Sequence, residues 1–154
     1  MNLRQINNKD QLCLKKVYFD SIKTIDNNIY SLEQKFAWSS QAWDNPNFEK
    51  SIAKGSGWLI HINGSIVAFA SRYPKYRVSL FYCMGKFQRK GYGSKLLKKL
   101  EDDAKKEGIE SLITEASLIS YKLFLKNNWE IVRKEKIIIK NKYFERYKMK
   151  KILN

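Results

Sequence analysis

The feature that most constrains the fold of this chain is the dipeptide Asn63-Gly64, which separates two short apolar segments. Residues 58–62 and 66–70 have the length and the composition of strands. Asn-Gly favours a type I′ turn, whose backbone twist matches that of an antiparallel strand pair. The sequence therefore predicts a β-hairpin at this point in the chain.

The segment before the hairpin has mainly helical periodicity. A short strand is expected over Leu3–Ile6, and apolar positions then follow helical spacing over about residues 10–25. Ser31 and Gln34 have the spacing of a capping box that opens a second helix. Asn45-Pro46 opens a third helix, which Gly55 ends.

After the hairpin the chain alternates between strands and helices. The expected elements are a strand from about Arg77 to Met84, a helix after Ser94 that ends at Gly108, a strand over Ser111–Glu115, a helix over about Leu118–Lys126, and strands over about Glu130–Lys140 and Tyr143–Lys150. The order β-α-α-α-β-β-β-α-β-α-β-β predicts a single α/β domain over residues 1–154. Its sheet should be mixed and mainly antiparallel, with helices on both faces.

Composition excludes several classes of protein. The two cysteines, Cys13 and Cys83, are too few for a disulfide scaffold, and the one histidine, His61, argues against a zinc site. The first residues lack the apolar stretch of a signal peptide, and no run approaches the roughly 18 apolar residues of a membrane helix. We therefore expect a cytoplasmic protein with no metal and no membrane association.

The chain is strongly basic, with 30 Lys and Arg against 15 Asp and Glu and a formal net charge of +15. Such a surface attracts polyanions such as nucleic acid or a phosphate-rich cofactor. Most of the excess is lysine, spread along the chain, whereas residues that read phosphates in a bidentate way are typically arginines. We therefore attribute the excess of basic residues to a general bias in residue usage, and binding of an anionic ligand is the alternative explanation.

The segment Gln88–Ser94, here called the glycine loop, lies between an expected strand and an expected helix. Gly91 and Gly93 permit a tight turn, and the helix that follows presents unpaired N–H groups, which together suit a pyrophosphate. The loop lacks the Gly-Lys-Ser/Thr order of a P-loop, and Leu96 replaces the third glycine of a dinucleotide-binding fingerprint. An ordinary strand-to-helix turn would use glycines in the same way.

The surroundings of the loop resemble a known family. Gln88-Arg89-Lys90-Gly91-Tyr92-Gly93 is similar to the Q/R-x-x-G-x-G/A loop of the GNAT superfamily of N-acetyltransferases. The strand over residues 79–84 resembles the central strand of that family, and residues 114–130 resemble its second coenzyme A segment. Tyr30-Ser31-x-x-Gln34-x-x-x-Trp38 is similar to a Y-[ST]-x-E-Q-x-x-A-W stretch of one bacterial branch. The resemblance runs through nearly the whole chain.

This resemblance implies a GNAT-like acyl-CoA N-acyltransferase fold with acetyl-CoA (coenzyme A) as the cofactor. A splay between the strand before the loop and the strand over Ser111–Glu115 would admit the thioester. The residues that the resemblance assigns to the cofactor are Gln88, Arg89, Lys90, Gly91, Tyr92, Gly93 and Ser94 at the pyrophosphate, Tyr82, Cys83 and Met84 along the pantetheine arm, and Ser117 and Phe124 beyond it.

The implied reaction is direct transfer of an acetyl group to an amine, which needs a base, a group that polarises the thioester carbonyl and a proton donor. A backbone N–H near Cys83 or Met84 would polarise the carbonyl. The family's usual proton-donating tyrosine is replaced here by Phe124, so Tyr121, Tyr82 or a water is the candidate donor, and packing as a half-exposed residue is the alternative role of Tyr121. Glu115 is the candidate base, and a salt bridge to a lysine is its alternative role.

Tyr30 and Trp38 are candidate walls of an acceptor pocket, because aromatic faces suit amines, and core packing is their alternative role. We expect an N-acetyltransferase that acts on a small-molecule or peptide amine as a monomer or homodimer. One alternative is a catalytically weak or inactive protein of the same fold that binds nucleic acid through its basic surface. Another is an acetyltransferase that acts on an RNA-borne amine.

Overall fold

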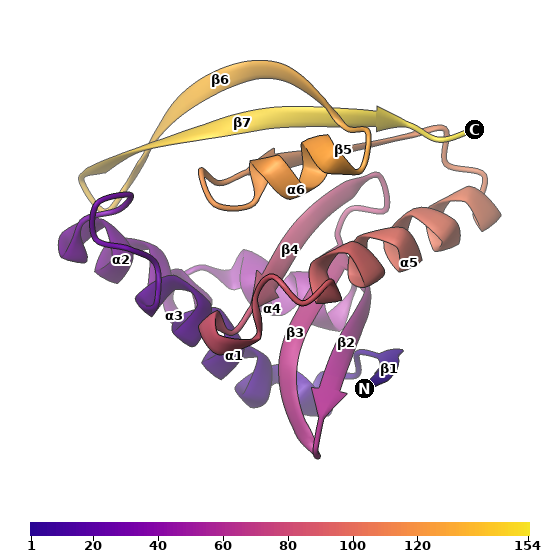
Figure 1. Cartoon of the computed structure of the whole chain (residues 1–154), viewed down its shortest axis with the longest axis horizontal. Coiled ribbons are helices and arrows are strands. Elements are labelled where there is room, and N and C mark those ends of the chain that lie inside the picture. The colour runs from indigo at the N-terminus through magenta and orange to yellow at the C-terminus, as the bar shows by residue number, and fades with distance from the viewer.

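A seven-stranded mixed sheet with the order β1-β2-β3-β4-β5-β7-β6 forms the centre of the computed structural model, which describes residues 1–154 (Figure 1). The strands are β1 (Asn2–Gln5), β2 (Ser56–Ile62), β3 (Ser65–Arg72), β4 (Arg77–Cys83), β5 (Ser111–Ala116), β6 (Glu130–Ile139) and β7 (Lys142–Ile152). Only the β4–β5 pair is parallel, and the other neighbours are antiparallel. The predicted fold class, a mixed and mainly antiparallel sheet flanked by helices, is confirmed.

The helices cover both faces of the sheet. They are α1 (Gln11–Lys23), α2 (Leu32–Ser39), α3 (Gln41–Asp44), α4 (Pro46–Ala53), α5 (Tyr92–Lys106) and α6 (Tyr121–Lys126), with short 3₁₀ turns at Asn8–Asp10 and Gly85–Phe87. Helices α1 and α4 pack on one face of the β2–β4 region, and α5 packs on the other (Figure 1). None of these helices is both long and apolar enough to cross a membrane.

Local sequence signals explain how several elements begin and turn. Asn63 and Gly64 have φ angles of +50° and +81°, as a type I′ turn requires, so the predicted hairpin is confirmed. Ser31 Oγ accepts from the N–H of Gln34 at 3.1 Å, and Gln34 Oε1 accepts from the N–H of Ser31 at 2.8 Å. This reciprocal capping box fixes the start of α2, as the spacing predicts.

Two expectations about the helices are corrected. The helix expected over about Leu118–Lys126 begins only at Tyr121, because Ser117 and Ser120 form a hydrogen-bonded turn that uses the N–H groups before the helix. The four-residue helix α3 was not expected, and it continues directly from α2 through Ser40.

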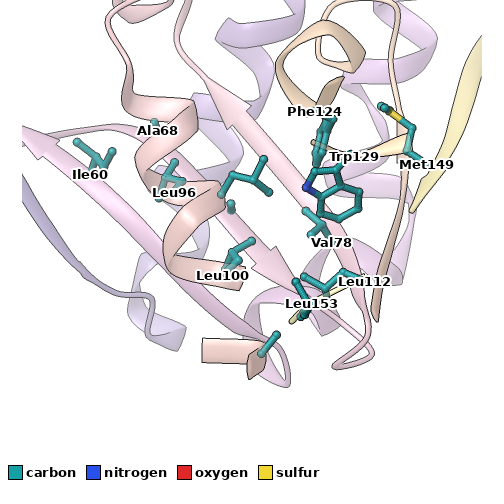
Figure 2. Packing of buried hydrophobic residues seen from close by; sticks show 14 of the residues in the cluster. Ile60, Ala68, Val78, Leu96, Leu100, Leu112, Phe124, Trp129, Met149 and Leu153 are labelled. Atoms are coloured by element: carbon teal, nitrogen blue, oxygen red, sulfur yellow. The ribbon is translucent and has the colours of Figure 1, made fainter. Parts of the chain in front are cut away.

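The larger hydrophobic core lies between the sheet and the helices α5 and α6. Leu96 and Leu100 of α5 and Phe124 of α6 face the sheet residues Val78 and Met149 in this core (Figure 2). A second core on the opposite face is built mainly from α1, α4 and the facing side chains of β2–β4. Strand β4 therefore has a packed layer on each side, which fixes its position relative to the glycine loop that follows it.

Candidate active site

Strands β4 and β5 separate after a short paired stretch. Their parallel pairing is limited to Arg77 with Ile113 and Val78 with Thr114, and beyond Val78 the edge of β4 that faces β5 has no strand partner. The predicted splay between these strands is therefore present. It leaves a narrow space of about 60 Å³, here called the strand gap. Its lining residues are Trp38, Val78, Ser79, Leu80, Phe81, Tyr82, Thr114, Glu115, Ala116, Ser117, Ser120 and Phe124.

The glycine loop enters α5 through a left-handed residue. Gly91 is the N-cap of α5 with a φ of +85°, a conformation that glycine adopts without steric cost, and no side chain caps this helix. The first-turn N–H groups of an α-helix have no acceptor within the helix. The start of α5 therefore offers unpaired donors and the positive end of the helix dipole to an anion.

A groove of about 390 Å³ lies along this loop and is here called the loop groove. A Cβ on Gly93 would come within 2.8 Å of Leu123 Cδ2, so a larger residue at that point of the wall would push the Leu123 side chain aside. The groove is lined by Ile29, Phe81, Cys83, Phe87, Gln88, Arg89, Gly91, Tyr92, Gly93, Ser94, Leu118, Ile119, Ser120, Lys122 and Leu123.

The cofactor residues expected from the sequence divide between these spaces. Cys83, Gln88, Arg89, Gly91, Tyr92, Gly93 and Ser94 line the loop groove, whereas Tyr82, Ser117 and Phe124 line the strand gap. Lys90 is exposed beside the ring of Phe87, at 5.9 Å from its centroid, and is not part of the groove wall. Met84 lines neither space, and its N–H donates to the carbonyl of Val67 at 2.9 Å.

Two contacts hold the start of the loop in place. Gln88 Nε2 donates to the carbonyl of Cys83 at 3.1 Å, which closes the turn after β4. The N–H of Gly85 donates to Asp20 Oδ2 at 2.9 Å, which ties the same turn to α1. Gln88 therefore shapes the loop in addition to lining the groove.

A third space, of about 170 Å³, lies on the other side of the strand gap and is here called the aromatic cavity. Tyr30 and Trp38 line it and pack edge to face at 5.3 Å, and Phe144 packs against Tyr30 at 5.9 Å. Tyr30 is 3% exposed, so it packs in the core and also lines this cavity. The complete lining is Tyr30, Trp38, Arg77, Ser79, Tyr82, Glu115, Ser117, Ile137, Ile139, Phe144, Glu145 and Arg146.

Glu115 lines both the strand gap and the aromatic cavity. Its carboxylate pairs with Nε of Arg77 at 2.9 Å, so the salt bridge weighed in the sequence is formed with an arginine instead of a lysine. The pair fixes the carboxylate at the boundary between the two spaces.

The two tyrosines considered as proton donors lie in different places. Tyr82 lines the gap and the cavity, its ring packs on Tyr18 at 4.6 Å, and burial raises the pKa of its hydroxyl to about 12. Tyr82 therefore stays protonated at neutral pH. Tyr121 packs on Tyr147 at 4.5 Å and lines none of the three spaces.

A pair of hydroxyls stands where the spaces meet: Ser117, which is expected from the sequence at the cofactor, and Ser120, which the sequence does not single out. Ser117 Oγ accepts from the N–H groups of Ile119 at 3.2 Å and Ser120 at 3.1 Å, so both of its lone pairs are used. Its own proton therefore lies on its 3.1 Å contact with Ser120 Oγ, which also accepts from the N–H of Ser117. The proton of the Ser120 hydroxyl is left without an acceptor, and Ser120 lines both the gap and the loop groove.

No group of three or more His, Cys, Asp or Glu side chains could hold a metal ion. His61 lies on β2, where its Nε2 accepts from Nε of Arg4 at 3.1 Å, and it lines none of the three spaces.

Comparisons with known proteins agree with this arrangement. Residues 20–128 match the model of the acetyltransferase (GNAT) family. The chain is 26% identical over 140 residues to YafP, an uncharacterized N-acetyltransferase of Escherichia coli (strain K12). The matched region covers 91% of this chain and 87% of that protein.

Solved structures show the same fold. A GCN5-related N-acetyltransferase from Rhodopseudomonas palustris superimposes with a TM-score of 0.91 at 24% identity, covering 99% of this chain and 95% of that one. The PaiA N-acetyltransferase from Thermoplasma acidophilum, solved in complex with coenzyme A, gives a TM-score of 0.75 at 17% identity and covers 99% of each chain.

Proposed function

Because the chain belongs to the acetyltransferase (GNAT) family, we propose that it transfers an acetyl group from acetyl-CoA directly to the amine of a small molecule or peptide. The observation that carries the proposal is the continuity of three spaces. Phe81 and Ser120 line both the loop groove and the strand gap, and Tyr82 and Glu115 line both the gap and the aromatic cavity. Two substrates that enter from opposite sides would meet between β4 and β5.

The residues of the loop groove fit acetyl-CoA. The uncapped start of α5 offers N–H groups to a pyrophosphate, and Arg89 and Lys122 in the groove wall add positive charge. The unpaired edge of β4 beyond Val78 offers backbone groups to the amides of the pantetheine arm. When bound, acetyl-CoA supplies the acetyl group as a thioester.

We assign the proton-accepting role to Glu115. Its carboxylate faces the aromatic cavity and the gap, so it is placed to take a proton from the acceptor amine, directly or through one water. Arg77 holds the carboxylate in that position. The aromatic side chains around the cavity orient the amine. Orientation of the reactants lowers the barrier of such a reaction by about 7 kcal/mol or more.

Two hydrogen-bond donors stabilise the negative charge that develops on the thioester oxygen and on the leaving sulfur during transfer. We assign polarisation of the thioester carbonyl to a backbone N–H of β4 between Ser79 and Cys83, since Met84 already donates to Val67. The free hydroxyl of Ser120 is assigned as the hydrogen-bond donor to the sulfur that leaves, which then takes its proton from water, because Ser120 stands where the groove opens into the gap. This hydroxyl takes the place of a tyrosine on α6, where the chain has Phe124 buried in the core.

The test is calorimetric titration of the purified protein with acetyl-CoA, with NADH and ATP as controls. Micromolar binding of acetyl-CoA alone is expected, followed by thiol release when a mixture of amines is added. Absence of acetyl-CoA binding, or equal binding of ATP, would contradict the proposal and leave the glycine loop as an ordinary turn.

A further inference from the structure

The aromatic cavity contains two guanidinium groups with unused donors. Arg77 pairs with Glu115 through Nε at 2.9 Å, and Arg146 pairs with Glu135 through Nε at 3.0 Å. The Nη atoms of Arg77 make no hydrogen bond within the protein, and Arg146 uses none of its Nη atoms either. Both side chains line the cavity and are about one-third exposed, at 35% and 31%. Four N–H-bearing nitrogens are therefore available for an acceptor.

The carboxylates of the same cavity are already paired. Glu115 is held by Arg77, and Glu145 is held by Lys134 at 2.8 Å. The Lys134 ammonium beside it lowers the pKa of Glu145, so this carboxyl stays ionised and neutralised by its partner. An acceptor with a second positive charge would find no unpaired carboxylate in this cavity.

The charge of the whole chain acts in the same direction. With 30 basic and 15 acidic residues, the protein carries a formal charge of +15. Its field repels polycations such as polyamines or lysine-rich peptides and attracts anions. The cavity volume of about 170 Å³ is below the roughly 300–1,000 Å³ of pockets that hold drug-sized ligands, so the part of the acceptor that enters this cavity is small.

We propose that the acceptor is a small primary amine that also carries an anionic group, a carboxylate or a phosphate, which Arg77 and Arg146 bind in the aromatic cavity. Guanidinium groups form their strongest hydrogen bonds with these two anions. The aromatic rings of Tyr30, Trp38 and Phe144 then contact the body of the acceptor. This inference rests on the proposed acetyl transfer and adds the chemical class of the acceptor.

The test compares acceptors that differ only in the anionic group. Thiol release from acetyl-CoA is measured with L-phenylalanine against 2-phenylethylamine, with O-phosphoethanolamine against ethanolamine, and with spermidine. In at least one pair the anionic member should have the higher kcat/KM by about tenfold or more, as expected for a charge-assisted contact. Preference in the phenylalanine pair would identify the anionic group as a carboxylate, and preference in the phosphoethanolamine pair would identify it as a phosphate.

Variants show whether the arginines cause the preference. Arg146→Gln should lower the ratio of kcat/KM between the anionic and the neutral member of the pair by most of that preference. Comparing this ratio in the variant and in the wild type cancels the difference in intrinsic reactivity between the two amines. Arg133→Gln is the matched control, because Arg133 also pairs with Glu135, at 3.0 Å, but lies outside the cavity wall. The control should keep the wild-type ratio, and thermal unfolding verifies that both variants fold.

The outcomes for the two proposals are distinct. Loss of acetyl-CoA binding in the calorimeter would contradict the acetyltransferase proposal and this inference with it. Retained acetyl-CoA binding would leave the first intact, and any of three results would then overturn only the second. These are turnover with spermidine above both anionic amines, a preference that Arg146→Gln does not change, and no turnover of either pair.

Discussion

The phenol oxygen of Tyr30 accepts a hydrogen bond from the backbone N–H of Leu118 at 2.9 Å, across 88 residues of chain. Tyr30 lines the aromatic cavity, whereas Leu118 lines the loop groove. One bond therefore joins the segment before α2 to the segment after β5 and connects the wall of the aromatic cavity with the wall of the loop groove. Burial raises the pKa of Tyr30, so its hydroxyl stays protonated at neutral pH.

Tyr30→Phe removes this bond while keeping the ring. The N–H of Leu118 loses its partner, which should lower the free energy of unfolding by about 1 kcal/mol. The KM values for acetyl-CoA and for the amine should both rise, because the two walls lose a common tie. Tyr143→Phe is the control, since Tyr143 is 68% exposed and its hydroxyl has no partner. If Tyr30→Phe matches the control in unfolding temperature and in both KM values, the bond has no role in the site.

Gly91→Glu should abolish acetyl-CoA binding. The new carboxylate would lie at the uncapped start of α5, where it would compete with phosphate for the N–H groups and repel it. A residue other than glycine at a φ of +85° costs about 1–2 kcal/mol of stability. Calorimetry should detect no binding of acetyl-CoA, and a dissociation constant that rises by less than about tenfold, a change of 1.4 kcal/mol, would contradict the assignment of the loop.

Gly64→Glu is a matched control for that variant. Gly64 has a φ of +81°, and like Gly91 it has no heavy atom within 4 Å of the position of a Cβ. The backbone strain is therefore the same, but the change lies in the β2–β3 turn instead of the glycine loop. Equal losses of acetyl-CoA affinity in the two variants would show that strain, and not the loop, causes the effect.

The parts of the site that could be predicted from the sequence are those set by local chemistry. The hairpin at Asn63-Gly64, the capping box at Ser31 and the position of Gly91 before α5 depend on neighbouring residues in the chain. The same holds for the general placement of the glycine loop after β4. Propensity and spacing determine such features, so the sequence contains them directly.

The rest of the site depends on contacts between distant segments. Phe144 and Arg146 enter the aromatic cavity because β7 lies between β5 and β6 in the sheet, an order that periodicity along the chain does not predict. The partner of Glu115 is Arg77 because the parallel register sets Arg77 opposite Ile113, two residues before Glu115 and on the same face of β5. Tyr121 has the spacing of a proton donor, but its ring packs against Tyr147 of β7.

Ser120→Ala tests the hydroxyl assigned to the leaving sulfur. The variant should lower kcat by about a hundredfold, the lower end of the range for loss of a positioned donor, and leave the dissociation constant for acetyl-CoA nearly unchanged. Ser120→Thr keeps a hydroxyl and should restore most of the activity. An unchanged kcat in Ser120→Ala would remove this residue from the mechanism, and equal loss in the alanine and threonine variants would indicate a packing role.

The reactivity of Cys83 should report both its burial and occupancy of the loop groove. Burial, together with the nearby charge of Asp20, raises the pKa of the Cys83 thiol to about 11. Only the thiolate reacts with iodoacetamide, so alkylation of Cys83 at pH 8 should be slow and should accelerate about tenfold per pH unit until the pH approaches 11. Cys13 is exposed and should react first.

Because Cys83 lines the loop groove and Cys13 does not, saturating acetyl-CoA should protect Cys83 alone, as measured by mass spectrometry of Cys13→Ser and Cys83→Ser variants. Protection of neither thiol, or rapid alkylation of Cys83 at pH 8, would contradict this placement of the residue in the groove wall.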